Sequence, residues 1–230
     1  MPNPAFPAIF QPCRTTPAHL ITMLPDSLHT DIAASIAGSA ARMVVEEGLE
    51  YGAAKLRAVK HLGLPPRTPL PDNARVEAEV RDYIALFCAD TQPAELLVLR
   101  QLALLWMQRM GNFRPYLGGS VWHGTATKLS DIYIALFCDD SKSAEIALID
   151  HRVDYLTRTI KGNVAGAKSA TVEALSIHAP CRALNTEIGV HLMVYDFDDL
   201  RGALKPDSQG RTPRGDAFAV TALLAAGNIR

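Results

Sequence analysis

The chain has 230 residues, enough for one large domain or two small ones. Its composition is that of a globular protein, and a net charge of −1 gives no reason to expect nucleic acid or an acidic membrane as an obligate partner. No apolar run is long enough to span a membrane, and the chain starts without the features of a secretory signal, so we expect a cytoplasmic protein. Four widely spaced cysteines predict reduced thiols and no zinc site.

Residues 1–25 form a first segment that contains six prolines. Proline fixes φ and removes a backbone donor, so no regular element is expected in this arm. Phe6, Ile9 and Phe10 are suited to packing against a neighbouring copy, which would make the N-terminal region a homo-oligomer contact. A loose tail is the alternative.

Residues 26–112 follow the three- and four-residue apolar spacing of helices. The first pattern runs from Asp26 to about Leu62, as one bent helix or as two, because Gly48 and Gly52 interrupt it. Two more helices are expected, one over 74–89 and one that begins at Pro93 and is apolar on nearly every side. We interpret three acidic residues of the region as a solvated helix face: Glu46, Glu47 and Glu50.

One hexamer occurs twice, as Tyr83 to Cys88 and as Tyr133 to Cys138. Helical spacing leads into the first copy, and a glycine-rich turn leads into the second. We therefore predict a helix for the first copy and a strand for the second, since tertiary context overrides propensity in so short a run.

Beyond residue 112 the apolar period changes towards two, which is typical of strands. The pattern predicts strands over 131–138, 154–160, 171–178 and 188–195, and helices over 144–151 and 217–226. One crossover helix among several strands indicates an α+β fold, with the helical region packed on a small mixed sheet. We expect this α+β domain to cover residues 113–230.

The most informative stretch runs from Leu117 to Ile134. A Gly-Gly-Ser turn opens it, a Gly-Thr pair follows, and Ser-Asp leads into the alternating strand. The stretch resembles the signature of the nucleotidyltransferase superfamily, in which a Gly-Gly/Ser turn precedes a strand that carries two acidic residues separated by an apolar one. The resemblance implies a nucleotidyltransferase-like α+β domain.

In that family the glycines let the backbone approach a nucleotide's phosphates, and the two carboxylates hold Mg²⁺. The resemblance therefore implies that a nucleoside triphosphate binds and that Asp131 is a metal ligand, both of them parts of nucleotidyl transfer. The implied nucleotide-binding residues are Gly118, Gly119, Ser120, Gly124, Thr125 and Ser130.

The sequence departs from the family pattern at both remaining acidic positions. Tyr133 occupies the second, and His191 stands where a later strand usually supplies the third. One interpretation is a rearranged catalytic site of Asp131 and Glu173, with His178 or His191 assisting. The other is that the acids have been lost and a non-catalytic domain remains.

The chain also resembles a group of bacterial proteins of similar length that share four of its segments: 42–50, 70–73, the Gly-Gly-Ser/Ser-Asp-Ile core and 198–201. Some of them are labelled UDP-N-acetylmuramate–alanine ligase. Such a ligase needs an ATP phosphate-binding loop and a much longer chain, and no Gly-x-x-x-x-Gly-Lys-Ser/Thr sequence occurs here. The sequence gives that label no support.

The leading hypothesis is thus a nucleotidyltransferase-like protein that binds a nucleoside triphosphate with Mg²⁺ through a depleted metal site. The alternative is a non-catalytic binding or interaction module that retains the fold. The sequence does not identify an acceptor.

Overall fold

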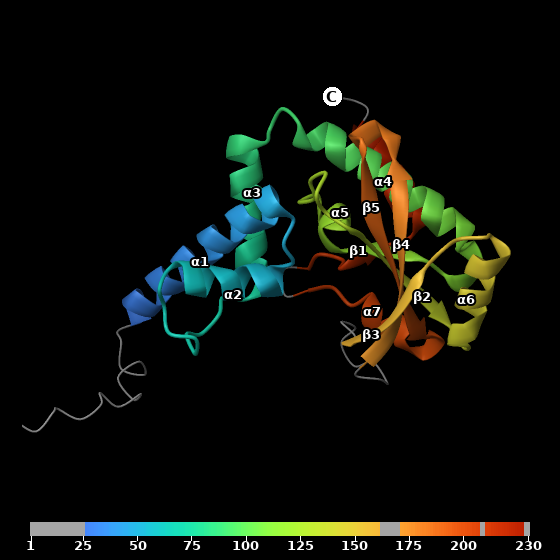
Figure 1. The fold of residues 1–230 in the computed structure, drawn as a ribbon, viewed down its shortest axis with the longest axis horizontal. Coiled ribbons are helices and arrows are strands. Elements are labelled where there is room, and N and C mark those ends of the chain that lie inside the picture. The colour runs from blue at the N-terminus through green and yellow to red at the C-terminus, as the bar shows by residue number, and fades with distance from the viewer. Residues whose placement is uncertain (1–25, 162–170, 208–209, 228–230) are drawn as a thin grey trace, which may run out of the picture.

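The computed structural model describes residues 26–161, 171–207 and 210–227, and the N-terminal arm lies outside these ranges. The described chain is α+β, as expected (Figure 1). Its α-helices are α1 (Asp26–Glu47), α2 (Tyr51–His61), α3 (Asn73–Phe87), α4 (Gln92–Arg109), α5 (Gly119–His123), α6 (Ser141–Asp150), α7 (Leu200–Ala203) and α8 (Ala217–Gly227). Its strands are β1 (Tyr116–Gly118), β2 (Ile132–Cys138), β3 (Leu156–Lys161), β4 (Thr171–Cys181), β5 (Thr186–Asp196) and β6 (Arg214–Gly215).

The six strands form one mixed sheet in the order β3-β4-β5-β2-β1-β6. The central pair, β2 and β5, is parallel and places Tyr133 opposite His191, while the other neighbouring strands are antiparallel. Within the described ranges, three short 3₁₀ helices connect elements: η2 (Gly111–Phe113), η3 (Arg182–Leu184) and η4 (Phe197–Asp199). The mixed sheet confirms the strand prediction, although β1, α5 and β6 are too short to have been predicted from periodicity.

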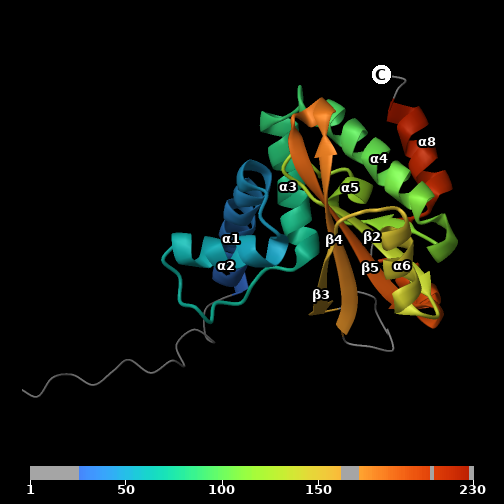
Figure 2. The same cartoon turned by 45° about the vertical axis from the view of Figure 1, so that its right-hand side comes forward.

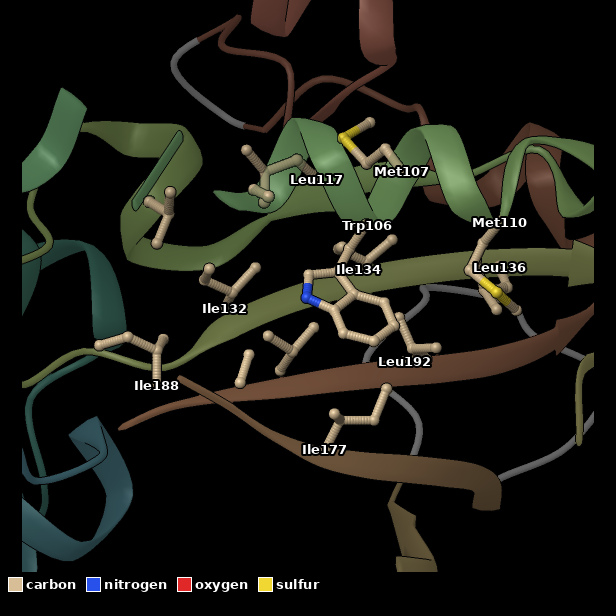
Figure 3. Packing of buried hydrophobic residues seen from close by; sticks show 14 of the residues in the cluster. Trp106, Met107, Met110, Leu117, Ile132, Ile134, Leu136, Ile177, Ile188 and Leu192 are labelled. Carbon is tan, nitrogen blue, oxygen red and sulfur yellow. The ribbon is translucent and has the colours of Figure 1, made fainter. Parts of the chain in front are cut away.

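One face of the sheet, here called the helix-covered face, carries Ile132, Ile134 and Leu136 of β2. Helix α4 packs on this face with Trp106 beside Ile134 and Leu192 (Figure 3). Helices α6 and α8 contribute to the same core, and Figure 2 shows all three helices on the side of the sheet away from α1 and α2. This apolar burial is the largest in the molecule and fixes the position of β2.

Helices α1, α2 and α3 form a separate hydrophobic core around Ile36, Ala40 and Val80. The break between α1 and α2 occurs at Gly48, whose φ of +69° is a left-handed conformation suited to glycine. A Cβ there would lie 2.8 Å from the backbone oxygen of Leu129, so the glycine also permits close contact with the loop before β2. Of the two forms that the sequence left open, two helices is the correct one.

The repeated hexamer takes two different conformations. Its first copy ends α3, where Leu86 and Phe87 are 74% and 64% exposed. Its second copy is most of β2, where Leu136 and Phe137 are 0% and 2% exposed. The helix is set by the cap at Asp72, which accepts a hydrogen bond from the Arg75 backbone N–H at 2.7 Å. Both predictions for the hexamer are confirmed.

None of the helices in the described ranges is both long enough and apolar enough to cross a lipid bilayer.

Candidate functional site

A pocket of about 440 Å³ lies between the junction of α1 and α2 and the second face of the sheet, here called the pocket face. The pocket face carries Tyr133 and Ala135 of β2 and Met193 and Tyr195 of β5. Figure 1 shows the side of the molecule on which α1 and α2 approach β1 and α5. A volume of this size suits a molecule comparable to a nucleoside or a sugar.

The Gly-Gly-Ser segment lines this pocket. Gly118 ends β1 and Gly119 begins α5, so the predicted turn is a change from strand to helix. Gly119 has a φ of +68°, and a Cβ there would lie 3.7 Å from the Tyr133 ring. The positive φ explains the glycine, and Ser120 follows it at the pocket wall.

Gly124 and Thr125, also predicted to bind nucleotide, do not line the pocket. Gly124 ends α5 with a φ of +84°, and Thr125 is 3% exposed. Gln92 of α4 donates to the Gly124 backbone oxygen at 3.0 Å, and Arg100 donates to the Val121 backbone oxygen at 3.1 Å. These contacts hold α5 and Gly124 on α4.

Asp131 lines the pocket immediately before β2, and its carboxylate lies 3.2 Å from His191 Nε2. The other ring nitrogen, Nδ1, is 2.9 Å from the Ser176 hydroxyl on β4. A neutral ring that carries its proton on Nε2 donates to Asp131 and accepts from Ser176, and this assignment satisfies both contacts. Ser176, His191 and Asp131 thus form one hydrogen-bonded chain across three strands.

Gly189 of β5 leaves space for the Asp131 carboxylate beside His191. A Cβ at Gly189 would lie 2.5 Å from Asp131 Oδ1 and 2.7 Å from its Cγ. The carboxylate therefore occupies the space above the glycine, which places it beside His191 two residues along the same face.

Tyr133 stacks on His191, with ring centroids 4.9 Å apart, and donates its hydroxyl to Glu50 Oε1 at 2.6 Å. Glu50 belongs to the α1–α2 junction, so this bond connects the sheet to the core of α1, α2 and α3, here called the helical unit. Burial and the hydrogen bond to Glu50 raise the pKa of Tyr133, and Asp131 acts in the same direction. The phenol therefore stays protonated at neutral pH.

Glu173, predicted to share a metal ion with Asp131, lies elsewhere. On β4 it pairs with Val194 of β5, which pairs with Leu136, five residues along β2 from Asp131. That separation is roughly 16 Å along the sheet at about 3.3 Å per residue. Glu173 also points to the helix-covered face, where Lys142 of α6 lies 3.6 Å from it. The two carboxylates cannot hold one ion together.

The pocket residues fit a magnesium site poorly. Mg²⁺ prefers several oxygen ligands in octahedral geometry, usually including more than one carboxylate. Here Asp131 faces His191, and the protonated Tyr133 hydroxyl donates to Glu50. Throughout 26–161, 171–207 and 210–227, no three His, Cys, Asp or Glu side chains are grouped closely enough to hold a metal ion. The implied role of Asp131 as a magnesium ligand thus lacks partners.

The electrostatic character of the pocket is acidic. Its lining includes the carboxylates of Glu50, Glu77 and Asp131 against the guanidinium of Arg214, which gives a formal charge of −2. Burial lowers the pKa of His123, so its ring adds no positive charge at neutral pH. Glu77 has its own partners in Arg81 and Arg211 at 2.9 and 3.2 Å, which leaves Glu50 and Asp131 as the carboxylates that dominate the field.

Sequence reasoning missed Glu50 and Ser176 as members of this site. Glu50 was interpreted as part of a solvated helix face, yet it meets Tyr133, 83 residues further along the chain. No local sequence pattern predicts a contact between residues so far apart in the chain. Ser176 had a usable signal, because it alternates with Leu175 and Ile177 and so faces away from the apolar core.

Comparison with known proteins establishes no family. No family model matches the chain, and no curated protein matches it. Among solved structures, the Cid1 poly(U) polymerase bound to MgGTP is similar over 50% of this chain and 38% of that chain, with 11% sequence identity and a TM-score of 0.33. A TM-score this low does not establish a shared fold, so the α+β assignment rests on the structure itself.

Proposed function

We propose that this protein is a binding module that holds a small polar molecule in the pocket and does not transfer nucleotides. One observation carries the proposal. At the two positions where the resembling family would carry acids stand Tyr133 and His191, and their polar atoms are bonded to Glu50, Ser176 and Asp131.

The chemistry of nucleotidyl transfer explains why this observation matters. The reaction needs divalent metal between the triphosphate and the attacking hydroxyl, held by anionic oxygen ligands. Tyr133 offers a protonated oxygen, and His191 offers a nitrogen already committed to Asp131. A metal at Asp131 would have to break the His191 contact without gaining a second carboxylate.

A second candidate, binding of a nucleoside triphosphate with Mg²⁺, has one observation in its favour. The Gly118–Ser120 segment, Ser130 and Asp131 all line the same pocket, as the resemblance implies. The acidic lining opposes it, since a triphosphate would meet two carboxylates before any cation other than Arg214. The acceptor of such a reaction is not defined by the pocket.

The lead proposal is tested by calorimetry in EDTA with nucleosides, sugars and amines, using a blocked pocket as reference. Gly52 lines the pocket on α2, and nothing lies within 4 Å of a Cβ there, so Gly52→Phe should fill the space without disturbing the fold. Gly111→Phe is the matched control, since its Cβ is equally free and it lies outside the pocket lining. Binding that Gly52→Phe abolishes and Gly111→Phe retains is the expected result; no binding by the wild type would refute the proposal.

The second candidate is tested by titrating Mg-ATP into the wild type and into Asp131→Ala, with EDTA as the comparison. We expect no magnesium-dependent binding and no labelled nucleotide on any product. Magnesium-dependent binding that Asp131→Ala removes would establish the second candidate in place of the first.

A further inference from the structure

The carboxylates that line the pocket indicate the charge of the molecule it binds, an inference that rests on the proposed function. Glu50 and Asp131 both line the pocket, and they come from different elements. Glu50 accepts the phenol hydroxyl at 2.6 Å from the α1–α2 junction, and Asp131 comes from the start of β2. Both carboxylates raise the pKa of Tyr133, so the negative charge of each acts on the Tyr133 hydroxyl.

Both carboxylates remain accessible from the pocket. Glu50 is exposed, and Asp131, which contacts His191 Nε2 through one oxygen, has a side chain that is 44% exposed. The Tyr133 hydroxyl satisfies one oxygen of Glu50 without neutralising it, because the phenol retains its proton. Both carboxylates line the pocket, so a cation inside it would be attracted by both.

The pocket walls suit an organic cation better than a bare metal ion. Rings of Tyr51 and Tyr133 line it, and Leu49, Ala135 and Met193 provide an apolar surface. Aromatic faces attract ammonium groups, and apolar surface suits a carbon skeleton, whereas a metal ion gains nothing from either. The volume of about 440 Å³ is also far larger than one ion needs.

We propose that the pocket binds a small protonated amine, with its ammonium group between Glu50 and Asp131 and its carbon skeleton against the tyrosine and methionine side chains. The amine donates to the carboxylate oxygens that Tyr133 and His191 leave available.

Pairs of probes in which ammonium replaces hydroxyl on the same carbon skeleton test this proposal: putrescine against 1,4-butanediol, and glucosamine against glucose. Titrations are run in EDTA on the wild type, Glu50→Gln and Glu47→Gln. Glu50→Gln keeps an oxygen that accepts from Tyr133 but removes the charge. Glu47 is the matched control, because it lies three residues away, pairs with Arg57 and does not line the pocket.

We expect the amine of at least one pair to bind roughly tenfold or more tightly than its neutral partner, and Glu50→Gln to remove that preference while Glu47→Gln keeps it. A neutral partner or a nucleoside that binds equally well, and that Gly52→Phe excludes, would overturn the amine assignment and leave the proposed function standing. No pocket binding by any probe would overturn both. In a separate titration without EDTA, binding of Mg²⁺ alone with the same dependence on Glu50 would show that the site is for a metal ion and would also overturn the assignment.

Discussion

The hydrogen bond between Tyr133 and Glu50 makes a quantitative prediction, because it joins the helical unit to the sheet across the pocket. Hydrogen bonds to charged groups contribute about 1.5–3 kcal/mol when they are shielded from water. Glu50 is exposed, so water replaces part of what Tyr133→Phe removes. We expect a coupling of about 1 kcal/mol between Tyr133→Phe and Glu50→Ala in a double-mutant cycle, since alanine removes the acceptor.

The cycle is measured by urea unfolding of the wild type, the two single variants and the double variant. The midpoint should shift at an unchanged m-value, and about 1 kcal/mol corresponds to a change in Tm of about 2–4 °C for a chain of this length. The pair Tyr83–Glu46 is a matched control, since the same two groups are bonded within the helical unit and away from the pocket.

The control cycle should show a smaller coupling, because burial is the main cause of the raised pKa of Tyr133, whereas the hydrogen bond to Glu46 is the main cause at Tyr83. Equal couplings in the two cycles, or none at Tyr133, would refute the reasoning that this bond ties the two units together.

Three further substitutions test individual parts of the structure. Gly189→Ala should lower the free energy of unfolding by about 1–2 kcal/mol in urea titrations, because the new Cβ displaces Asp131. The control Gly52→Ala should be neutral or stabilising, since its Cβ meets nothing. Equal effects of the two substitutions would contradict the placement of Asp131. Asp72→Ala should cost about 1 kcal/mol by removing the cap of α3, and an unchanged thermal midpoint would contradict that. Burial lowers the pKa of His123, so the unfolded state takes up its proton first as the pH falls below about 6.5, and stability is lost there. His123→Asn should flatten that loss between pH 7 and pH 5, and a parallel pH profile would contradict it.

The fold was largely predictable because its longer elements carry their own patterns. Helices α3 and α4 show helical spacing with recognisable starts at Asp72 and Pro93, and β2 and β5 carry large apolar residues at every second position. Elements of two to five residues, such as β1 and β6, carry no period and exist through pairing with β2 and with each other. The repeated hexamer likewise has no pattern of its own that decides its structure, since the same six residues end a helix in one place and form a strand in the other.

The site was predictable only in part, because it depends on which strands meet and on which face. The resemblance implied that Gly118, Gly119 and Asp131 act together, and the pairing of β1 with β2 brings them to one pocket. Glu173 could have been rejected from alternation alone, since it shares its face with Leu175 and Ile177 of the core. The bond from Glu50 to Tyr133 could not have been predicted, because it depends on how two separate cores pack.

The central claim, that Tyr133 and His191 leave Asp131 without the partners of a metal site, is tested most directly by electron paramagnetic resonance of Mn²⁺, an ion that favours the same oxygen ligands as Mg²⁺. The wild type and Asp131→Ala are titrated beside the double variant Tyr133→Asp/His191→Asp. We expect no Mn²⁺ site that depends on Asp131 in the wild type, and a new site in the double variant, where three carboxylates converge. A wild-type site that Asp131→Ala abolishes would contradict the account.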